Sequence, residues 1–105
     1  MNKYILVLTT VPDKKIGQEI ARVLVGERLA ACVTVSGACQ SSYWWKKKIS
    51  QDQEYILFIK TRGELYPNLE EKILEIHPYE VPEIIVLPLI HGYPKYFDWI
   101  AKETD

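Results

Sequence analysis

Four side chains of this sequence could act as soft metal ligands: Cys32, Cys39, His77 and His91. Copper prefers imidazole and sulfur ligands that converge on one point, and no two of these residues have a typical ligand spacing. Cys32 lies in an apolar stretch, where a small buried thiol is the ordinary structural role. His77 lies at the end of a predicted helix, where it could instead contact the last carbonyls or orient the Pro78 turn. We therefore keep His77 as the one candidate ligand for copper or another divalent cation, beside that structural role.

Hydrolysis or acyl transfer would need a nucleophile with a positioned base, for which Cys39 with His77 or His91 is the candidate. No motif supports this pairing. The five glycines are never spaced as in the phosphate-binding loops GxGxxG and GxxxxGK. The sequence therefore predicts a binding protein and not an enzyme.

Aromatic and basic side chains follow one another from Tyr43 to Lys48. In a strand, Tyr43 and Trp45 would share one side and Trp44 the other, with lysines on both sides. Such a stretch could stack bases and hold phosphates. We favour the alternative, a subunit interface in which Trp and Tyr are enriched and the lysines protect a strand edge. Nucleic acid is not an expected partner.

Two charged residues, Glu54 and Lys60, flank an apolar run and lie six residues apart, hence on one face of a strand. A buried unpaired charge is very costly, so Lys60 should pair with a carboxylate, for which Glu83 is the candidate. We expect this pair at a cleft between subunits, where it could contribute to a ligand site. The alternative is an ion pair with a purely structural role. The side chains expected at this cleft or interface are Tyr43, Trp45, Glu54, Lys60, Tyr79 and Glu83.

Hydrophobic periodicity indicates the elements that must position these residues. It predicts strands at 3–10, 30–35, 41–48, 54–61 and 83–89, and helices at 13–28, 65–76 and 94–102. Residues 30–35 and 41–48 should form a hairpin about Ser36 and Gly37, and 54–61 should be a central strand. The order β-α-β-β-α-β, with an extended hairpin and a C-terminal helix, predicts an α+β ferredoxin-like split β-α-β sandwich. Two helices cover only one face of such a sheet, so the other face needs a partner.

Length and charge restrict the class of protein further. The 105 residues fit a single domain, 1–105. The net charge of -1 creates no field that would attract nucleic acid or a membrane surface. The apolar run from Tyr4 to Leu8 is too short for a signal-peptide core or a membrane span. We therefore expect a cytoplasmic protein with reduced cysteines and no membrane partner.

Several motifs together resemble one known family. They are Leu29-Ala30-Ala31-Cys32-Val33, Ile59-Lys60-Thr61 and, most specifically, His77-Pro78-Tyr79-Glu80-Val81-Pro82-Glu83-Ile84. The chain resembles the CutA divalent-cation-tolerance family over nearly its whole length, as far as Tyr96 and Trp99. The resemblance implies a homotrimer with the architecture of the PII signalling proteins. It also implies a non-enzymatic role in tolerance to copper and other divalent metals, with copper binding in some members.

The chain departs from the family pattern at three places. Members credited with copper binding carry a cysteine near the end of the first strand and two histidines before the Pro-Tyr pair. Here these positions hold Thr9 and Ile76, which leaves His77 alone. Lys47 replaces the usual hairpin glycine, so we expect a different twist there. The likeness to PII proteins implies an alternative function, a small-molecule or anion sensor with its site near Lys60 at the cleft between subunits.

Overall fold

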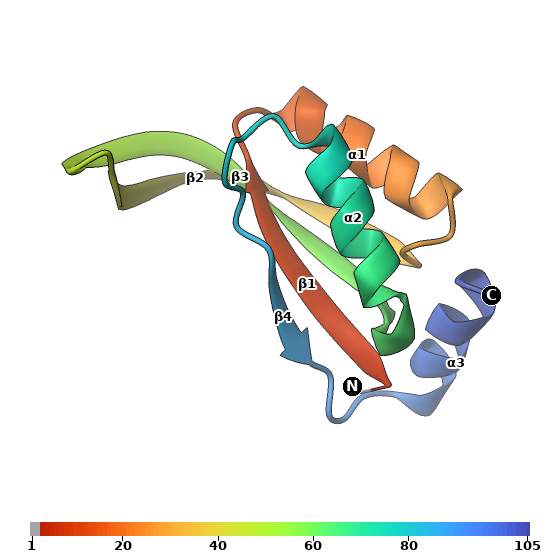
Figure 1. Ribbon diagram of the computed structural model, residues 1–105. Coiled ribbons are helices and arrows are strands. Elements are labelled where there is room, and N and C mark those ends of the chain that lie inside the picture. The colour runs from red at the N-terminus through yellow and green to blue at the C-terminus, as the bar shows by residue number, and fades with distance from the viewer. Residues whose placement is uncertain (1–2) are drawn as a thin grey trace.

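The computed structural model describes residues 3–105, which form a four-stranded antiparallel sheet in the order β2-β3-β1-β4. The strands are β1 (Tyr4–Val11), β2 (Cys32–Trp45), β3 (Lys48–Arg62) and β4 (Ile85–Pro88). The helices are α1 (Lys14–Gly26), α2 (Tyr66–Ile76) after a short 3-10 helix (Gly63–Leu65), and α3 (Pro94–Glu103). Helices α1 and α2 lie on one face of the sheet (Figure 1). This arrangement confirms the predicted α+β ferredoxin-like fold, with β3 in the interior of the sheet.

Local signals in the sequence determine where the two long helices begin. Asp13 precedes α1, and its Oδ1 accepts a hydrogen bond of 2.8 Å from the backbone N–H of Ile16. This satisfies one of the N–H groups that the first helical turn leaves without a partner. Pro67 lies in the first turn of α2, where its missing N–H costs nothing.

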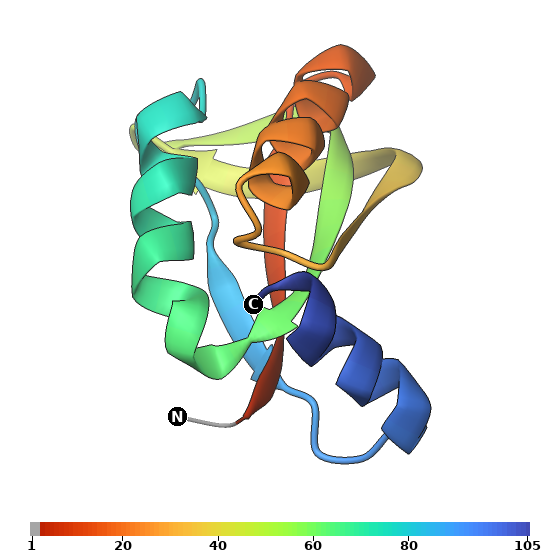
Figure 2. The ribbon, with the colours of Figure 1, turned by 90° about the vertical axis from the view of Figure 1, so that its right-hand side faces the viewer.

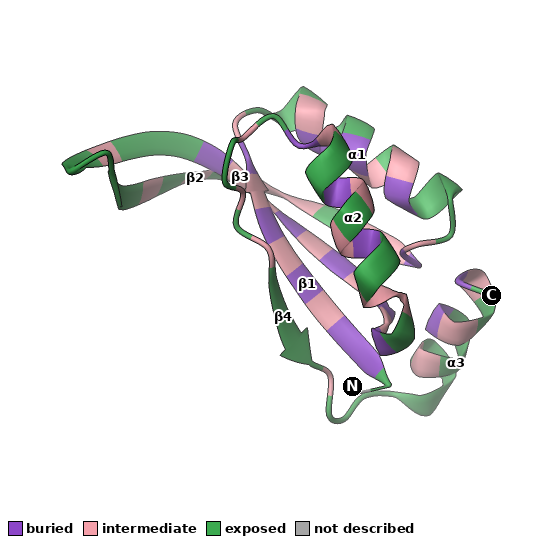
Figure 3. Cartoon of the chain, viewed as in Figure 1, coloured by how far each residue is buried: buried purple, intermediate pink, exposed green. Residues whose placement is uncertain are grey.

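The main core lies between the sheet and helices α1 and α2. Alternate residues of β1, namely Ile5, Val7 and Val11, point into it and are fully or almost fully buried (Figure 3). Helix α3 packs separately at one end of the sheet, as Figure 2 shows. There the rings of Tyr4 and Phe97 stack with their centroids 4.7 Å apart.

The face of the sheet opposite the main core is incompletely covered, and we call it the open face. Its apolar side chains come from three strands, and none of them is buried. They are Leu6, Leu8, Ile56, Phe58, Ile85 and Leu87. Leu87 is 40% exposed and Ile85 is 48% exposed. A contiguous apolar surface of this kind is typical of an interface with another protein.

The predicted hairpin about Ser36 and Gly37 is wrong. Residues 32–45 form one strand, β2, which is interrupted only by a β-bulge between Val35 and Ala38. The Ser36 hydroxyl accepts a hydrogen bond of 2.8 Å from the Ile56 backbone N–H, which the bulge would otherwise leave without a partner. The chain therefore bends at Ser36 and Gly37 but continues as a strand.

The true hairpin joins β2 to β3 through Lys46 and Lys47, since Trp45 pairs with Lys48. Both turn residues have positive φ, 50° and 66°, as a two-residue hairpin turn requires. Only residues 55–62 of β3 pair with β1. The remainder of the hairpin, residues 38–54, projects beyond the sheet as a two-stranded arm (Figure 1). An isolated two-stranded arm is marginally stable in water, so it too is suited to contact with a partner.

Candidate functional site

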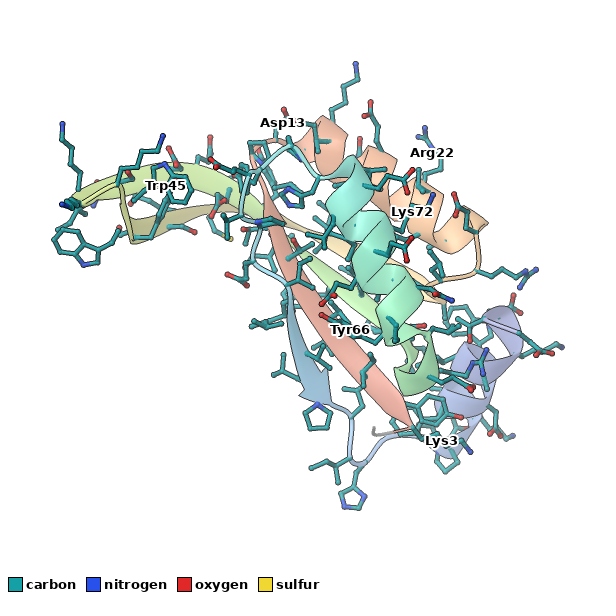
Figure 4. All side chains as sticks on the ribbon, in the orientation of Figure 1. Lys3, Asp13, Arg22, Trp45, Tyr66 and Lys72 are labelled. Carbon is teal, nitrogen blue, oxygen red and sulfur yellow. The ribbon has the colours of Figure 1, made fainter. Side chains whose placement is uncertain are left out.

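A groove of about 720 Å³ lies where the arm meets the segment that follows α2. Its aromatic lining consists of Tyr43, Trp44, Trp45 and Tyr79. Its charged lining consists of Glu54, Glu80 and Glu83. We call this site the aromatic groove. Figure 4 shows Trp45 on the arm, away from the helices, so the groove is not part of the main core.

Glu54 and Tyr79 hold the two sides of the aromatic groove together. Glu54 lies on β3 opposite Cys39, and only 7% of the residue is exposed. The Tyr79 hydroxyl donates a hydrogen bond of 2.6 Å to Glu54 Oε2. Burial raises the pKa of Tyr79, and the hydrogen bond to Glu54 raises it further, because ionised Tyr79 would face a carboxylate. Tyr79 therefore stays protonated and serves as the donor that fixes Glu54.

A second phenol of the groove is arranged in the same way. The Tyr43 hydroxyl donates a hydrogen bond to Asp52 Oδ2 across the two strands of the arm. This hydrogen bond is the main cause that raises the pKa of Tyr43. Both phenolic protons at the groove are thus directed to carboxylates and not to a ligand.

His77 uses both ring nitrogens inside the protein. Its Nδ1 accepts a hydrogen bond of 3.1 Å from the Tyr79 backbone N–H, and its Nε2 lies 2.8 Å from the Thr10 carbonyl oxygen. The ring must therefore carry its proton on Nε2 and be neutral. Burial lowers the pKa of His77, although the hydrogen bond to Thr10 and the charge of Glu54 oppose this effect. His77 orients the turn that places Tyr79, which is the structural role considered for it above.

Within one chain, these residues do not fit a copper site. His77 has no free lone pair in this arrangement, and no three potential ligands among residues 3–105 converge on one point. Thr9, where the resemblance implies a cysteine in copper-binding members, is fully buried, and its hydroxyl has no hydrogen-bond partner among residues 3–105. The part of the chain that the structure describes also contains no hydrogen bond between a cysteine and a histidine, as the hydrolytic alternative would need.

Five of the six residues expected at a cleft line the aromatic groove, and Lys60 does not. Lys60 is in register with Leu6 on β1 and with Cys32 on β2, on the open face. Glu83 precedes β4 by two residues and so lies toward the opposite end of that sheet. No salt bridge within residues 3–105 joins the two. Their pairing between subunits stays a prediction.

Sequence reasoning missed Trp44 and Glu80 as groove residues. Strict strand alternation puts Trp44 on the side opposite Tyr43 and Trp45, yet all three line the groove beside the hairpin turn. Glu80 lies within the His-Pro-Tyr-Glu block, between two residues that were selected. The position of Glu80 between these two residues was the feature of the sequence that could have predicted it as a groove residue.

No helix among residues 3–105 has the length and apolar character needed to cross a membrane. Cys32 and Cys39 are both free thiols, as expected. The cytoplasmic location stays a prediction, and one relative described next is named as chloroplastic.

Comparison with known proteins agrees with the resemblance seen in the motifs. The family model described as CutA1 divalent ion tolerance protein matches residues 5–103. The divalent-cation tolerance protein CutA of Thermus thermophilus is 42% identical over 99 residues, which are 94% of this chain and 96% of that protein. The chloroplastic protein CutA 1 of Oryza sativa is 42% identical over 95% of this chain. The chain spans 56% of that longer relative.

A solved structure leads to the same assignment. The crystal structure of CutA from Xylella fastidiosa superposes with a TM-score of 0.95 at 39% identity, and the match covers 99% of this chain and 100% of that one. The agreement extends over sequence, order of elements and fold. The chain therefore belongs to the CutA1 divalent ion tolerance family.

Proposed function

We propose that the protein acts in divalent-cation tolerance as a homotrimer, and that it does so by binding and not by catalysing a reaction. The observation that carries this proposal is the open face. Six apolar side chains from β1, β3 and β4 remain accessible there, although the rest of the fold has a well-buried core. Self-association would remove this surface from water, which is the dominant favourable contribution to assembly.

The number of subunits rests on the resemblance to CutA proteins, and the role in tolerance rests on the family's name. The absence of catalysis is supported by the way potential catalytic groups are used. His77 is neutral and doubly hydrogen-bonded, and Cys39 contacts Ser36 and the Gly37 carbonyl. Neither side chain is arranged as a nucleophile with its base.

Native mass spectrometry of the full chain, titrated with copper and with zinc, tests this proposal. We expect the mass of three chains before any metal is added. A monomeric mass at micromolar concentration would contradict the assembly.

The same titration addresses the prediction of a metal at His77. Uptake of one ion per subunit that is lost in His77→Ala would support that site. Uptake that is unchanged in His77→Ala would contradict it. A matched His91→Ala variant controls for adventitious binding to an exposed imidazole.

A second candidate function is a PII-like sensor of a small anion, and the position of Lys60 favours it. Lys60 is in register with Leu6 on the open face and forms no salt bridge to any residue in 3–105. An anion bound between subunits would satisfy its charge. Lys60→Met should then abolish binding of ATP or phosphate and leave the trimer intact. Unchanged binding, or loss of the trimer in this variant, would contradict the candidate.

A further inference from the structure

We infer that α3 is a strap, which means a helix that is ordered only while it is docked at the end of the sheet, where two arginine side chains hold it closed. Its release would extend the apolar surface of the open face and leave the main core folded. The contacts that carry the inference all lie within one chain, at the opposite end of the sheet from the aromatic groove (Figure 2).

Helix α3 packs on a cluster of its own. The buried members of this cluster are Ile100 on the helix and Tyr4 and Ala31 beneath it, and the Phe97 ring stacks on the Tyr4 ring with the centroids 4.7 Å apart. Among residues 3–105, those that form the main core include none from α3. Segments that are joined to a fold by few buried apolar contacts are the ones that open locally. The main core should therefore survive the release of α3.

The helix is too short to be stable by itself. It has ten residues, from Pro94 to Glu103, and isolated helices shorter than about 12–15 residues are marginal in water. Its N-cap residue, Tyr93, forms no side-chain capping hydrogen bond within residues 3–105. Docking must therefore supply the order of α3, and an undocked α3 would unfold.

Two arginines from other elements bind the C-terminal end of α3. Arg62, the last residue of β3, donates from Nη2 to the Thr104 carbonyl oxygen (2.6 Å) and from Nε to the Thr104 hydroxyl oxygen (2.8 Å). Arg28, beyond α1, donates from Nη1 to the Glu103 carbonyl oxygen (2.9 Å). The last carbonyls of a helix have no partner within it, and cations suit the negative end of its dipole. These two side chains therefore hold the strap closed.

The backbone of Arg28 gives independent support for this role. Its φ is 58°, a conformation in which glycine is the usual residue just after a helix, because a Cβ atom is disfavoured there. Its side chain nevertheless reaches Glu103, 75 residues further along the chain, where it also forms a salt bridge of 3.4 Å with Oε2. Backbone strain of this kind persists where the surrounding contacts require it. The contact with α3 is such a requirement.

Docked α3 covers one end of the open face. Tyr4 precedes Ile5, which points into the main core, so the Tyr4 side chain lies on the other side of β1, with that of Leu6. Tyr4 is nevertheless only 8% exposed, because Phe97 stacks on it. Release of α3 would uncover Tyr4 next to Leu6. The strap thus determines how far the apolar surface extends toward this end of the sheet.

Amide hydrogen exchange of the purified full chain, followed residue by residue, tests the inference. We expect the amides of α3 to exchange at least about tenfold faster than the buried amides of β1 and β3, because they open without global unfolding. Equal protection of α3 and β1 would show that α3 is released only when the whole protein unfolds. That result would overturn the inference.

Variants at the two ends of the Arg62 contact test what holds the strap. Thr104→Val keeps the size of the side chain and removes the hydroxyl that accepts from Arg62, and Arg62→Met keeps an apolar stem without donors. In both variants we expect exchange in α3 to be about tenfold faster and exchange in β1 to be unchanged. Arg22→Met, at an exposed arginine of α1, is the matched control. If α3 exchanges alike in all three variants and the parent, the arginines do not hold it.

Arg28→Gly separates the strain from the contact. Glycine relieves the positive φ, so exchange at the C-terminal end of α1 should be slower, whereas exchange in α3 should be faster because the contact with Glu103 is lost. Slower exchange in both helices would contradict the role of Arg28 in the strap. A variant that is merely less stable would show faster exchange in both helices and in β1, and that result would contradict it too.

A dye that binds accessible apolar surface tests the consequence of release. ANS fluorescence should rise in Thr104→Val relative to the parent and stay unchanged in Arg22→Met. No rise in Thr104→Val would show that α3 does not limit the apolar surface. The native mass decides the proposed assembly separately. Three chains with an α3 as protected as β1 would overturn the strap alone, and a monomer with a fast-exchanging α3 would overturn the assembly alone.

Discussion

At the scale of single residues, the histidine of the His-Pro-Tyr block is a structural connector. Its two nitrogens link the end of β1, through the Thr10 carbonyl, to the backbone of Tyr79. Tyr79 continues the connection to Glu54 on β3. Because Nδ1 can accept from the Tyr79 N–H only when the ring is neutral, protonation of His77 would break the link from β1 to Tyr79 and the groove.

The stability of the protein should depend on the protonation of His77. Its pKa in the folded state lies below the ordinary value of 6.5, chiefly because the ring is buried. The unfolded chain therefore takes up a proton first as the pH falls, and stability decreases below about pH 6.5. We expect the Tm to fall between about pH 7.5 and 5.5, and to fall less in His77→Gln.

Thermal unfolding followed by circular dichroism measures this dependence. The variant His91→Gln, at an exposed position, is the control and should retain the parent's pH dependence. Glu54 and Tyr79 face the same ring, so the comparison is limited to the pH range above the ordinary titration of carboxylates. Identical pH profiles for the parent and His77→Gln would show that the ring does not stay neutral in the fold.

At the scale of elements, the turn of the arm carries backbone strain. Lys46 and Lys47 both adopt positive φ, where an L-residue other than glycine, asparagine or aspartate is uncommon. Two-residue hairpins adopt this conformation because its twist matches that of the strands. The departure at Lys47 from the usual glycine therefore changes the residue type but leaves the hairpin in place.

Replacement of Lys47 by glycine should stabilise the arm. Glycine reaches φ near 66° without the Cβ clash that costs an L-residue about 1–2 kcal/mol, and its greater loss of backbone entropy, about 0.5–1 kcal/mol, offsets part of this gain. We expect amide hydrogen exchange in residues 38–54 to slow by about two- to fivefold, because local opening of the arm becomes less favourable. Lys48→Gly, within β3, is the control and should speed exchange. Slower exchange in both variants, or in neither, would contradict this explanation.

In the whole molecule, two features indicate contact with other protein chains. The open face leaves apolar side chains of three strands accessible, and the arm extends the molecule to 44 Å along its longest axis. The arm also carries the aromatic side chains of the groove. Assembly of several chains would cover the face and support the arm at the same time.

A single charge on the open face should prevent this assembly. Leu87 lies on the edge strand β4, in register with Leu6 on β1, within the apolar part of the open face. Leu87→Lys would bury an ammonium group in the interface, so we expect a monomer by light scattering coupled to size-exclusion chromatography. Leu74→Lys changes a similarly exposed leucine on α2, on the helix side of the molecule, and should assemble as the parent does. Assembly of Leu87→Lys with the mass of the parent would show that the interface lies elsewhere.

The fold class and most of the elements could be predicted from residue patterns alone. A continuous apolar run begins β1, and apolar side chains recur at helical spacing in α1 and α2. These patterns depend on neighbouring residues only, so they can be recognised without the tertiary structure. The motif from His77 to Ile84 was equally local, and it identified the family that the comparisons confirm.

Which side chains come together could not be predicted in this way, because it depends on contacts between segments far apart in the sequence. Whether Ser36 and Gly37 make a turn or a bulge depends on Ile56, which lies twenty residues away and whose N–H the Ser36 hydroxyl satisfies. The separation of Lys60 from Glu83 follows from the register of β1, β3 and β4, which residue types do not specify. Hydrogen bonds between distant segments fix the strand register and the path of the chain. A pattern of neighbouring residues does not predict these hydrogen bonds, so it does not predict the register.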